Sequence, residues 1–324
     1  MSLDTDLLMD RRRLRRGLTT WRLIAFVAAV IAVIGLGLAF AGKDVFSKAT
    51  PQIARVSISG VITGDDATLK LLKDVSEASA VQGVVLNVNS PGGTVTGSEA
   101  LHEAIRKLVA AKPTVATVDS VAASGGYIAV IATDHIVSRG SSIVGSIGVI
   151  AQYPNFTKLL DTVGVKVDSV RSSPLKAQPD GVSPTPPEAT AALQATVLDS
   201  YAWFKDLVKA RRHLSDAELA AISDGRVFTG RQGLPLKLID EIGGEDKAID
   251  WLVKEKKVAK DLPIRDWKRE QQSISRFPFA GAAAELARQA GLTSLANALS
   301  APATTFEAAT LDGLVSVWQP AGQN

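Results

Sequence analysis

The chain has 324 residues, with 36 basic and 33 acidic side chains and a net charge of +3. The first 22 residues hold six arginines and three aspartates, a surplus of three positive charges, so the rest of the chain is neutral overall. A neutral folded part offers no basic surface for nucleic acid, and we exclude that class of partner. The absence of cysteine excludes disulfide bonds, cysteine catalysis and most structural zinc sites.

An uncharged apolar segment follows the arginine-rich arm. Residues 23–42 contain no charged side chain and are long enough to cross a bilayer as a helix. Because arginines resist translocation, we expect residues 1–22 to stay in the cytoplasm and the chain beyond the linker at 43–52 to lie in the periplasm. The chain would then be a single-pass protein of the inner membrane. The alternative is a signal peptide cleaved after residues 39–41 (Ala-Phe-Ala), although the apolar stretch is longer than a usual signal core.

Strand and helix patterns alternate after the linker. Residues 53–60 alternate apolar and polar side chains, which indicates a half-buried, edge-type strand. Residues 83–89 form a nearly continuous apolar run, typical of a strand covered on both faces. The same patterns predict helices at 66–80, 98–111 and 124–133, and strands at 114–118, 136–138 and 143–150. This order predicts an α/β fold built from βαβ units with parallel strands.

The second half of the chain combines helical patterns with one proline-rich segment. Residues 172–187 contain five prolines, so we expect a loop or extended arm there. The helical patterns lie at 155–163, 188–213, 215–222, 230–236 and 245–257. We place the end of the folded domain near residue 260. Residues 261–324 form a small-residue-rich extension whose helical spacing suits a subunit interface or a membrane surface.

Two glycine-containing turns follow predicted strands, and a third interrupts the β-like run at 143–150. They are residues 90–94 (Ser-Pro-Gly-Gly-Thr), 124–126 (Ser-Gly-Gly) and 145–148 (Gly-Ser-Ile-Gly). Glycine lets the backbone approach a ligand closely, and helix N-termini present unpaired N–H groups to negative charge. We therefore expect an oxyanion site, with the Gly93 amide as one donor and the Ser124 amide as the other.

Patterns for other ligands are missing from the sequence. The turn at Ser124 lacks the Lys-Ser/Thr pair of a P-loop, and nothing matches the Gly-x-Gly-x-x-Gly of dinucleotide sites. The histidines, His102, His135 and His213, lie in unrelated contexts without metal-ligand spacing, and we expect His102 and His135 to be packing or surface residues. Ser124 therefore has no histidine placed to activate it, and a serine hydroxyl needs a neighbouring base to act as a nucleophile.

Taken together, three motifs resemble one family. Residues 89–93 (Asn-Ser-Pro-Gly-Gly), 122–127 (Ala-Ala-Ser-Gly-Gly-Tyr) and 145–149 (Gly-Ser-Ile-Gly-Val), in this order behind one anchor, resemble the signal peptide peptidase A family in its short, single-domain bacterial form. The resemblance covers about residues 53–244. It implies a spiral of βαβ units like that of the Clp protease subunit and crotonase, over residues 53–260, and a serine endopeptidase that needs no metal or cofactor.

The resemblance also assigns roles to individual residues. Ser124 matches the nucleophile, Lys176 the general base, Gly93 the oxyanion donor and Ser146 a serine that orients the lysine. Lys166 and Lys158 are weaker alternatives for the base. A lysine must be desolvated to bring its pKa from about 10.4 towards about 7 to 8 before it can accept a proton. The neighbours of Lys176 contain no carboxylate before Asp180, which favours a neutral amine.

The family further implies an assembly and a substrate. It implies a homo-octameric ring in which the serine of one subunit meets the lysine of the next, and remnant signal peptides or other short apolar peptides as substrates beside the membrane. The proline-rich segment that contains Lys176 suits an arm reaching to a neighbour. Two alternatives stay open: a crotonase-like acyl-CoA enzyme, which uses the same oxyanion geometry, and a catalytically silent membrane scaffold.

Overall fold

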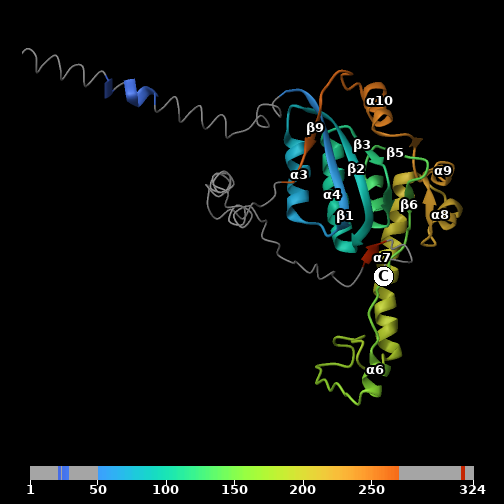
Figure 1. Ribbon diagram of the computed structural model, residues 1–324. Helices are drawn as coiled ribbons and strands as arrows, with labels where there is room; N and C mark the ends of the chain where they lie inside the picture. The colour runs from blue at the N-terminus through green and yellow to red at the C-terminus, as the bar shows by residue number, and fades with distance from the viewer. Residues whose placement is uncertain (1–20, 23, 29–49, 270–314, 318–324) are drawn as a thin grey trace, which may run out of the picture. The chain divides into compact units, whose positions relative to one another are not determined.

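One long strand, β2 (Val81–Thr94), organises the computed structural model, which describes residues 21, 22, 24–28, 50–269 and 315–317 (Figure 1). Along one side β2 runs parallel to β1 (Gln52–Ile62). Along the other, its first half pairs with β3 (Thr114–Val118) and its second half, at Ser90, with β4 (Val121–Ala123). The sheet therefore divides at β2 into two parts, and the second part carries the glycine turns.

The result is a mixed α/β fold with a curled, largely parallel sheet. The strands follow the order β7–β6–β4–β2–β3–β5–β8, with β1, β9 and β10 beside this path. Among the described residues the antiparallel pairs are β6 with β7 and β2 with β10. The remaining strands are β5 (His135–Ser138), β6 (Ile143–Gly145), β7 (Val227–Thr229), β8 (Glu241–Ile242), β9 (Ile264–Trp267) and β10 (Val315–Val317).

Helices alternate with these strands as the sequence predicts. The described helices of the unit that begins at Gln52 are α3 (Asp66–Glu77), α4 (Val95–Ala111), α5 (Gly125–Ile131), α6 (Thr157–Thr162), α7 (Pro187–Arg212), α8 (Asp216–Ile222), α9 (Gly230–Gly233) and α10 (Glu245–Lys256). Asp65 caps α3 by accepting from the Thr68 amide, and Thr94 caps α4 by accepting from the Gly97 amide. These caps fix where α3 and α4 begin, because each satisfies an amide that has no partner within the helix.

The core lies between the sheet and helices α3, α4, α5 and α7. All five residues of β3 and all seven of α5 are buried, which agrees with the small and apolar residues that dominate both sequences. Leu86, Ile105 and Ile128 are among the fully buried side chains, and each such burial contributes about 1.5 to 3 kcal/mol. The central helix α5 is thus held on every side by apolar contacts.

Two sequence expectations about the sheet are wrong. β1 was expected at an edge, but it lies between β2 and β9, both parallel to it. Its first half is largely buried, whereas most of its residues from Ser57 to Val61 are exposed. β9, at Ile264–Trp267, also extends the sheet past residue 260, where we expected the domain to end. At two to four residues, β4, β7, β8 and β9 carry too little pattern to be predicted, although the equally short β5 was expected at 136–138.

An arm with few buried side chains leaves the core after β6. It comprises residues 150–186, including α6, and the first half of α7, and Figure 1 shows α6 well away from the sheet. No residue of α6 is buried, and the predicted proline-rich loop is confirmed as irregular structure. The second half of α7 returns to the core through Phe204 and Val208, both fully buried.

Both ends of the chain fall largely outside the described residues. The predicted basic arm at 1–22, anchor at 23–42 and linker at 43–52 belong mostly to the unit that ends at Pro51, of which short helical pieces are described. Within the described part of the chain, no helix has the length and apolar character needed to span a bilayer. The predicted small-residue-rich extension at 261–324 lies outside the described residues apart from 261–269 and 315–317.

Candidate active site

Two of the predicted site residues lie at the ends of neighbouring strands. Ala123 of β4 pairs with Gly145 of β6, so Ser124 and Ser146 leave the two strands side by side. Both serines have a left-handed backbone, with φ of 55° and 54°, which is strained for a residue with a Cβ and is typical of functional turns. Ser124 is 1% and Ser146 8% exposed, so both are enclosed by the fold.

The helix that follows Ser124 is held at both ends. Ser124 is its N-cap residue, and the Ser124 carbonyl accepts from the amides of Tyr127 and Ile128. At the other end, Arg211 of α7 donates to the carbonyls of Ile131 and Thr133 at 2.8 and 2.9 Å. The helix that presents Ser124 is therefore fixed by its own capping bonds at one end and by α7 at the other.

Tyr127 adds a further fixed point beside the nucleophile position. Its hydroxyl donates to the Leu238 carbonyl at 2.9 Å, and burial raises the pKa of the phenol, so it remains a neutral donor. A buried tyrosine whose hydroxyl has a partner stabilises the packing without an unsatisfied polar group.

The first two glycine turns are in direct contact. A Cβ added at Gly125 would lie 3.0 Å from the Gly93 nitrogen, and one added at Gly93 would lie 1.7 Å from the Ile62 carbonyl oxygen. Ser90 shapes the first turn, because its hydroxyl donates to the Gly60 carbonyl at 2.6 Å and accepts from the Gly92 amide at 3.1 Å. Only glycine fits at these two contacts, which brings the Gly93 and Ser124 backbones together.

The expected second oxyanion donor is corrected by this geometry. The Ser124 amide donates to the Gly145 carbonyl at 2.8 Å, so it is engaged between β4 and β6 and is not presented to a substrate. The Gly125 amide is the better candidate, because Gly125 is the first residue of α5 and its N–H has no acceptor within the helix. Sequence reasoning missed Gly125 because its nearness to Gly93 arises from tertiary contact.

Ser98 is a second residue that the sequence reasoning missed. It is fully buried in the first turn of α4, and its hydroxyl has no hydrogen-bond partner in the described part of the chain. Its Oγ would lie 2.3 Å from a Cβ placed on Gly125, so it packs against the same turn. Its position after the Pro-Gly-Gly turn was the only signal in the sequence.

The predicted base lies elsewhere in the same chain. Lys176 is exposed on the arm, where its amide donates to the Ser173 carbonyl at 3.1 Å. Among the described contacts, no hydrogen bond joins its side chain to Ser124 or Ser146. The alternatives Lys158 and Lys166 are exposed on the arm as well. One copy of the chain thus brings together Gly93, Ser124 and Ser146 but does not add a lysine to them.

His102 and His135 occupy packing positions, as predicted, whereas His213 is exposed. The His102 Nδ1 lies 3.1 Å from the Ile128 carbonyl oxygen, and burial lowers the pKa of the ring. His135 stacks on Trp251 with ring centroids 4.8 Å apart. Across residues 50–269, no three carboxylate or histidine side chains cluster as a metal site would require.

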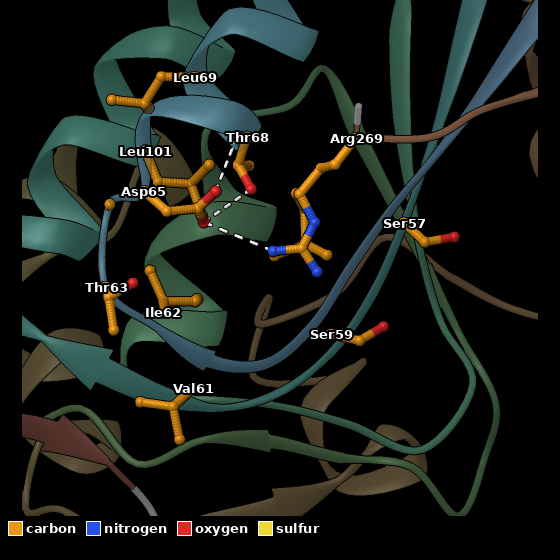
Figure 2. A pocket seen from close by; sticks show the side chains of 12 residues that line it. Ser57, Ser59, Val61, Ile62, Thr63, Asp65, Thr68, Leu69, Leu101 and Arg269 are labelled. Atoms are coloured by element: carbon orange, nitrogen blue, oxygen red, sulfur yellow. Dashed lines mark hydrogen bonds and ion pairs between the residues drawn. The ribbon is translucent and has the colours of Figure 1, made fainter. Parts of the chain in front are cut away.

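A small pocket lies next to the first glycine turn, between β1 and the N-termini of α3 and α4. Figure 2 shows that Asp65, Thr68 and Arg269 point toward one another there. Asp65 accepts from the Thr68 amide and hydroxyl at 2.9 and 2.8 Å and pairs with Arg269 at 3.6 Å. The cavity of about 20 Å³ has room for about one water molecule. Its charged groups, Asp65 and Arg269, are already paired with each other, so we place no chemistry in it.

Comparison with known proteins identifies the family. Residues 106–259 match the model of peptidase family S49. A Synechocystis protein named "Putative protease slr0021" is 36% identical over 202 residues, which cover 62% of this chain and 73% of that protein. An Enterococcus faecium protein named "Putative signal peptide peptidase SppA" is 31% identical over 68% of this chain and 67% of its own length. Protease 4 of Haemophilus influenzae is 28% identical, and the match covers 37% of that longer protein. The chain therefore belongs to peptidase family S49, as an SppA-type serine peptidase.

Proposed function

We propose that this chain is a membrane-anchored endopeptidase with a ClpP- and crotonase-like fold, in which Ser124 and Lys176 cleave remnant signal peptides and other short apolar peptides. The observation that carries the proposal is the pairing of β10 with β2. Val315–Val317 runs antiparallel to Gly92–Thr94, the residues around the candidate oxyanion donor. An extended segment is thus already accommodated where a peptide carbonyl must lie, and main-chain pairing is how many proteins bind extended peptides.

In the proposed reaction the Ser124 hydroxyl attacks the peptide carbonyl carbon while the Lys176 amine takes its proton. The Gly93 and Gly125 amides donate to the oxygen that becomes negatively charged. The intermediate then collapses, the C–N bond breaks, and the lysine ammonium gives its proton to the leaving amine. A water molecule, deprotonated by the same lysine, then attacks the acyl carbon; the bond to the Ser124 oxygen breaks, and the lysine ammonium returns its proton to that oxygen, which restores the free enzyme. Ser146, beside Ser124, would orient the lysine amine.

The proposal places the lysine of one copy beside the serine of another. The exposed position of Lys176 on the arm supports this arrangement, as does the apolar surface of the arm, where Leu159, Val163 and Val170 are exposed. Large exposed apolar patches commonly mark interaction surfaces. An octameric ring on the periplasmic side of the inner membrane would bury this surface, desolvate the lysine and enclose the site near its substrates.

The decisive experiment measures peptide cleavage by the full-length protein in detergent. Ser124→Ala and Lys176→Ala should each abolish cleavage of a fluorogenic apolar peptide, whereas Lys166→Ala and Lys158→Ala should retain it. Co-expression of Ser124→Ala with Lys176→Ala chains should restore about a quarter of the activity, because a random ring then pairs an intact serine with an intact lysine at one site in four. Co-expressed rings as inactive as the single variants would contradict a shared site.

The two alternative functions, a membrane scaffold and a crotonase-like acyl-CoA enzyme, predict different results with the same full-length protein in detergent. A fluorophosphonate probe should label Ser124 in the wild type, and absence of both labelling and cleavage would favour a scaffold. Turnover of an acyl-CoA thioester without peptide cleavage would favour the crotonase-like enzyme.

A further inference from the structure

One ion pair organises the loop that carries Lys176. An Arg171 Nη atom lies 2.5 Å from a carboxylate oxygen of Asp180, and these side chains are only 18% and 13% exposed. The other oxygen of Asp180 accepts from the amides of Val182 and Ser183 at 3.0 and 2.9 Å. The loop closes on itself around this carboxylate.

The same arginine holds the peptide of the proposed base. Its second Nη atom donates to the carbonyl of Lys176 at 2.6 Å and to that of Ala177 at 3.0 Å. Ala177 has a left-handed φ of 56°, a conformation that a non-glycine residue keeps only where its surroundings fix it. Arg171 therefore links the backbone on both sides of the Lys176–Ala177 bond to the Asp180 carboxylate.

Apolar packing does not fix this loop within one chain. Ser172 to Ala177 are all exposed, and α6 beside them buries no residue. The pKa of Asp180 is lowered to about 2 by the hydrogen bonds that its carboxylate accepts. The largest effect comes from the Ser183 amide, followed by the Ser183 hydroxyl, the Val182 amide and Arg171. The carboxylate is ionised at neutral pH, and its hydrogen bonds and ion pair hold the loop in place of apolar packing.

We propose that Arg171 and Asp180 are positioning residues for Lys176, which set where its side chain leaves the arm. This inference rests on the proposed role of Lys176 as the base. A lysine has a long flexible stem, so its amine reaches the serine reproducibly only if its backbone is fixed. Displacing a reacting group by about 1 Å can cost about 100-fold in rate.

The test compares kcat and KM in the full-length protein. Arg171→Gln and Asp180→Asn should each lower kcat about 10- to 100-fold with KM within about twofold. Arg171→Lys should recover little, because an ammonium cannot donate to Asp180 and two carbonyls as the planar guanidinium does. The matched control is Arg139→Gln, which removes an exposed pair with Asp119 at 2.9 Å and should leave kcat within about twofold.

Placing Arg171→Gln in only one of two co-expressed chains distinguishes a role in positioning Lys176 from a general role in folding. In co-expressed rings, Arg171→Gln should reduce the restored activity when it is placed in the Ser124→Ala chain, which supplies the lysine. It should have no effect in the Lys176→Ala chain, which supplies only the serine. Equal loss in both arrangements would show a general folding role and overturn the proposal.

The remaining outcomes distinguish the two proposals. Unchanged kcat in Arg171→Gln, with Lys176→Ala inactive, would overturn the positioning role and leave the base in place. Full activity of Lys176→Ala would overturn the base itself, and the positioning role with it.

Discussion

The region around Ser124 and the arm that carries Lys176 are stabilised in opposite ways. Every residue of α5, which follows Ser124, is buried, and Arg211 holds its far end. No residue of α6 is buried, and the loop beyond it is organised by the contacts of Arg171 and Asp180. Apolar packing between distant segments places the serine, whereas local polar bonds shape the arm.

This difference indicates which changes should affect each region. The core has little room for added atoms, so small steric changes there should alter both folding and catalysis. The arm has room but lacks burial, so changes there should alter assembly and catalysis and leave the stability of the core unchanged.

The largest effect is expected from Gly93→Ala. The added Cβ would lie 1.7 Å from the Ile62 carbonyl oxygen, so β1 and β2 must separate beside the proposed oxyanion site. We expect kcat/KM to fall at least about 100-fold, the cost of losing an oxyanion donor, and the free energy of unfolding to fall by about 3 kcal/mol. Peptide cleavage and urea unfolding measure the two effects.

The control for Gly93→Ala lies in the same strand. A Cβ on Gly83 would meet only side-chain atoms of Val258 and Leu252 at 3.3 to 3.5 Å, so Gly83→Ala should change kcat/KM less than about twofold. Equal activity of the two variants would show that the contact between Gly93 and Gly125 does not form the site.

Helix α7 crosses from the core to the arm and allows a comparison within one element. Phe204 is fully buried and Leu198 is 53% exposed. Phe204→Ala should lower the free energy of unfolding by about 3 to 5 kcal/mol, because it leaves a cavity. Leu198→Ala should lower it by less than about 1 kcal/mol. Similar losses, measured by urea unfolding of dilute protein, would mean that the first half of α7 packs as firmly as the second.

The sequence predicted most of the core and only part of the site. Apolar runs predicted β2, β3 and α4, and the glycine turns marked the backbone around Gly93 and Ser124. The pairing of β4 with β6, which brings Ser124 and Ser146 together, is seen only in the structure. The spacing of apolar residues predicts these strands and helices because it reflects which of their faces are buried. Gly125 and Ser98 escaped prediction because their roles depend on contact between turns that are far apart in the sequence.

The surroundings of Lys176 could not be predicted from the pattern for a different reason. Its exposed loop is shaped by Arg171 and Asp180, five residues before and four after it, and such polar contacts leave no periodic signal. No described residue of the same chain buries Lys176, so the proposed base role requires that another copy or the substrate desolvates its amine.

The apolar surface of the arm gives the next test. Val170→Asp and Leu159→Asp place a charge on exposed apolar positions that the proposed ring would bury. Burial of an unpaired carboxylate costs several kcal/mol, so the assembly should dissociate and cleavage should fall at least about tenfold. Unfolding of the core should be unchanged. Sedimentation velocity measures the assembly, with the nearby polar change Asp168→Asn as control, and an intact assembly in both aspartate variants would exclude this face.

The smallest effect is expected from pH and concerns the arm alone. The pKa of Asp180 is lowered to about 2, mainly by the Ser183 amide, with Arg171 also contributing. A lowered carboxyl pKa gives stability that is present above the ordinary value near 3.9 and is lost as the pH falls through about 2. The carboxyl carbon signal of Asp180 should therefore titrate well below pH 3.9 in the wild type, and nearer its ordinary range in Arg171→Gln. An ordinary midpoint in the wild type would mean that the carboxylate is not held by these bonds in solution, and the arm would then need a neighbouring copy to give Lys176 a fixed place.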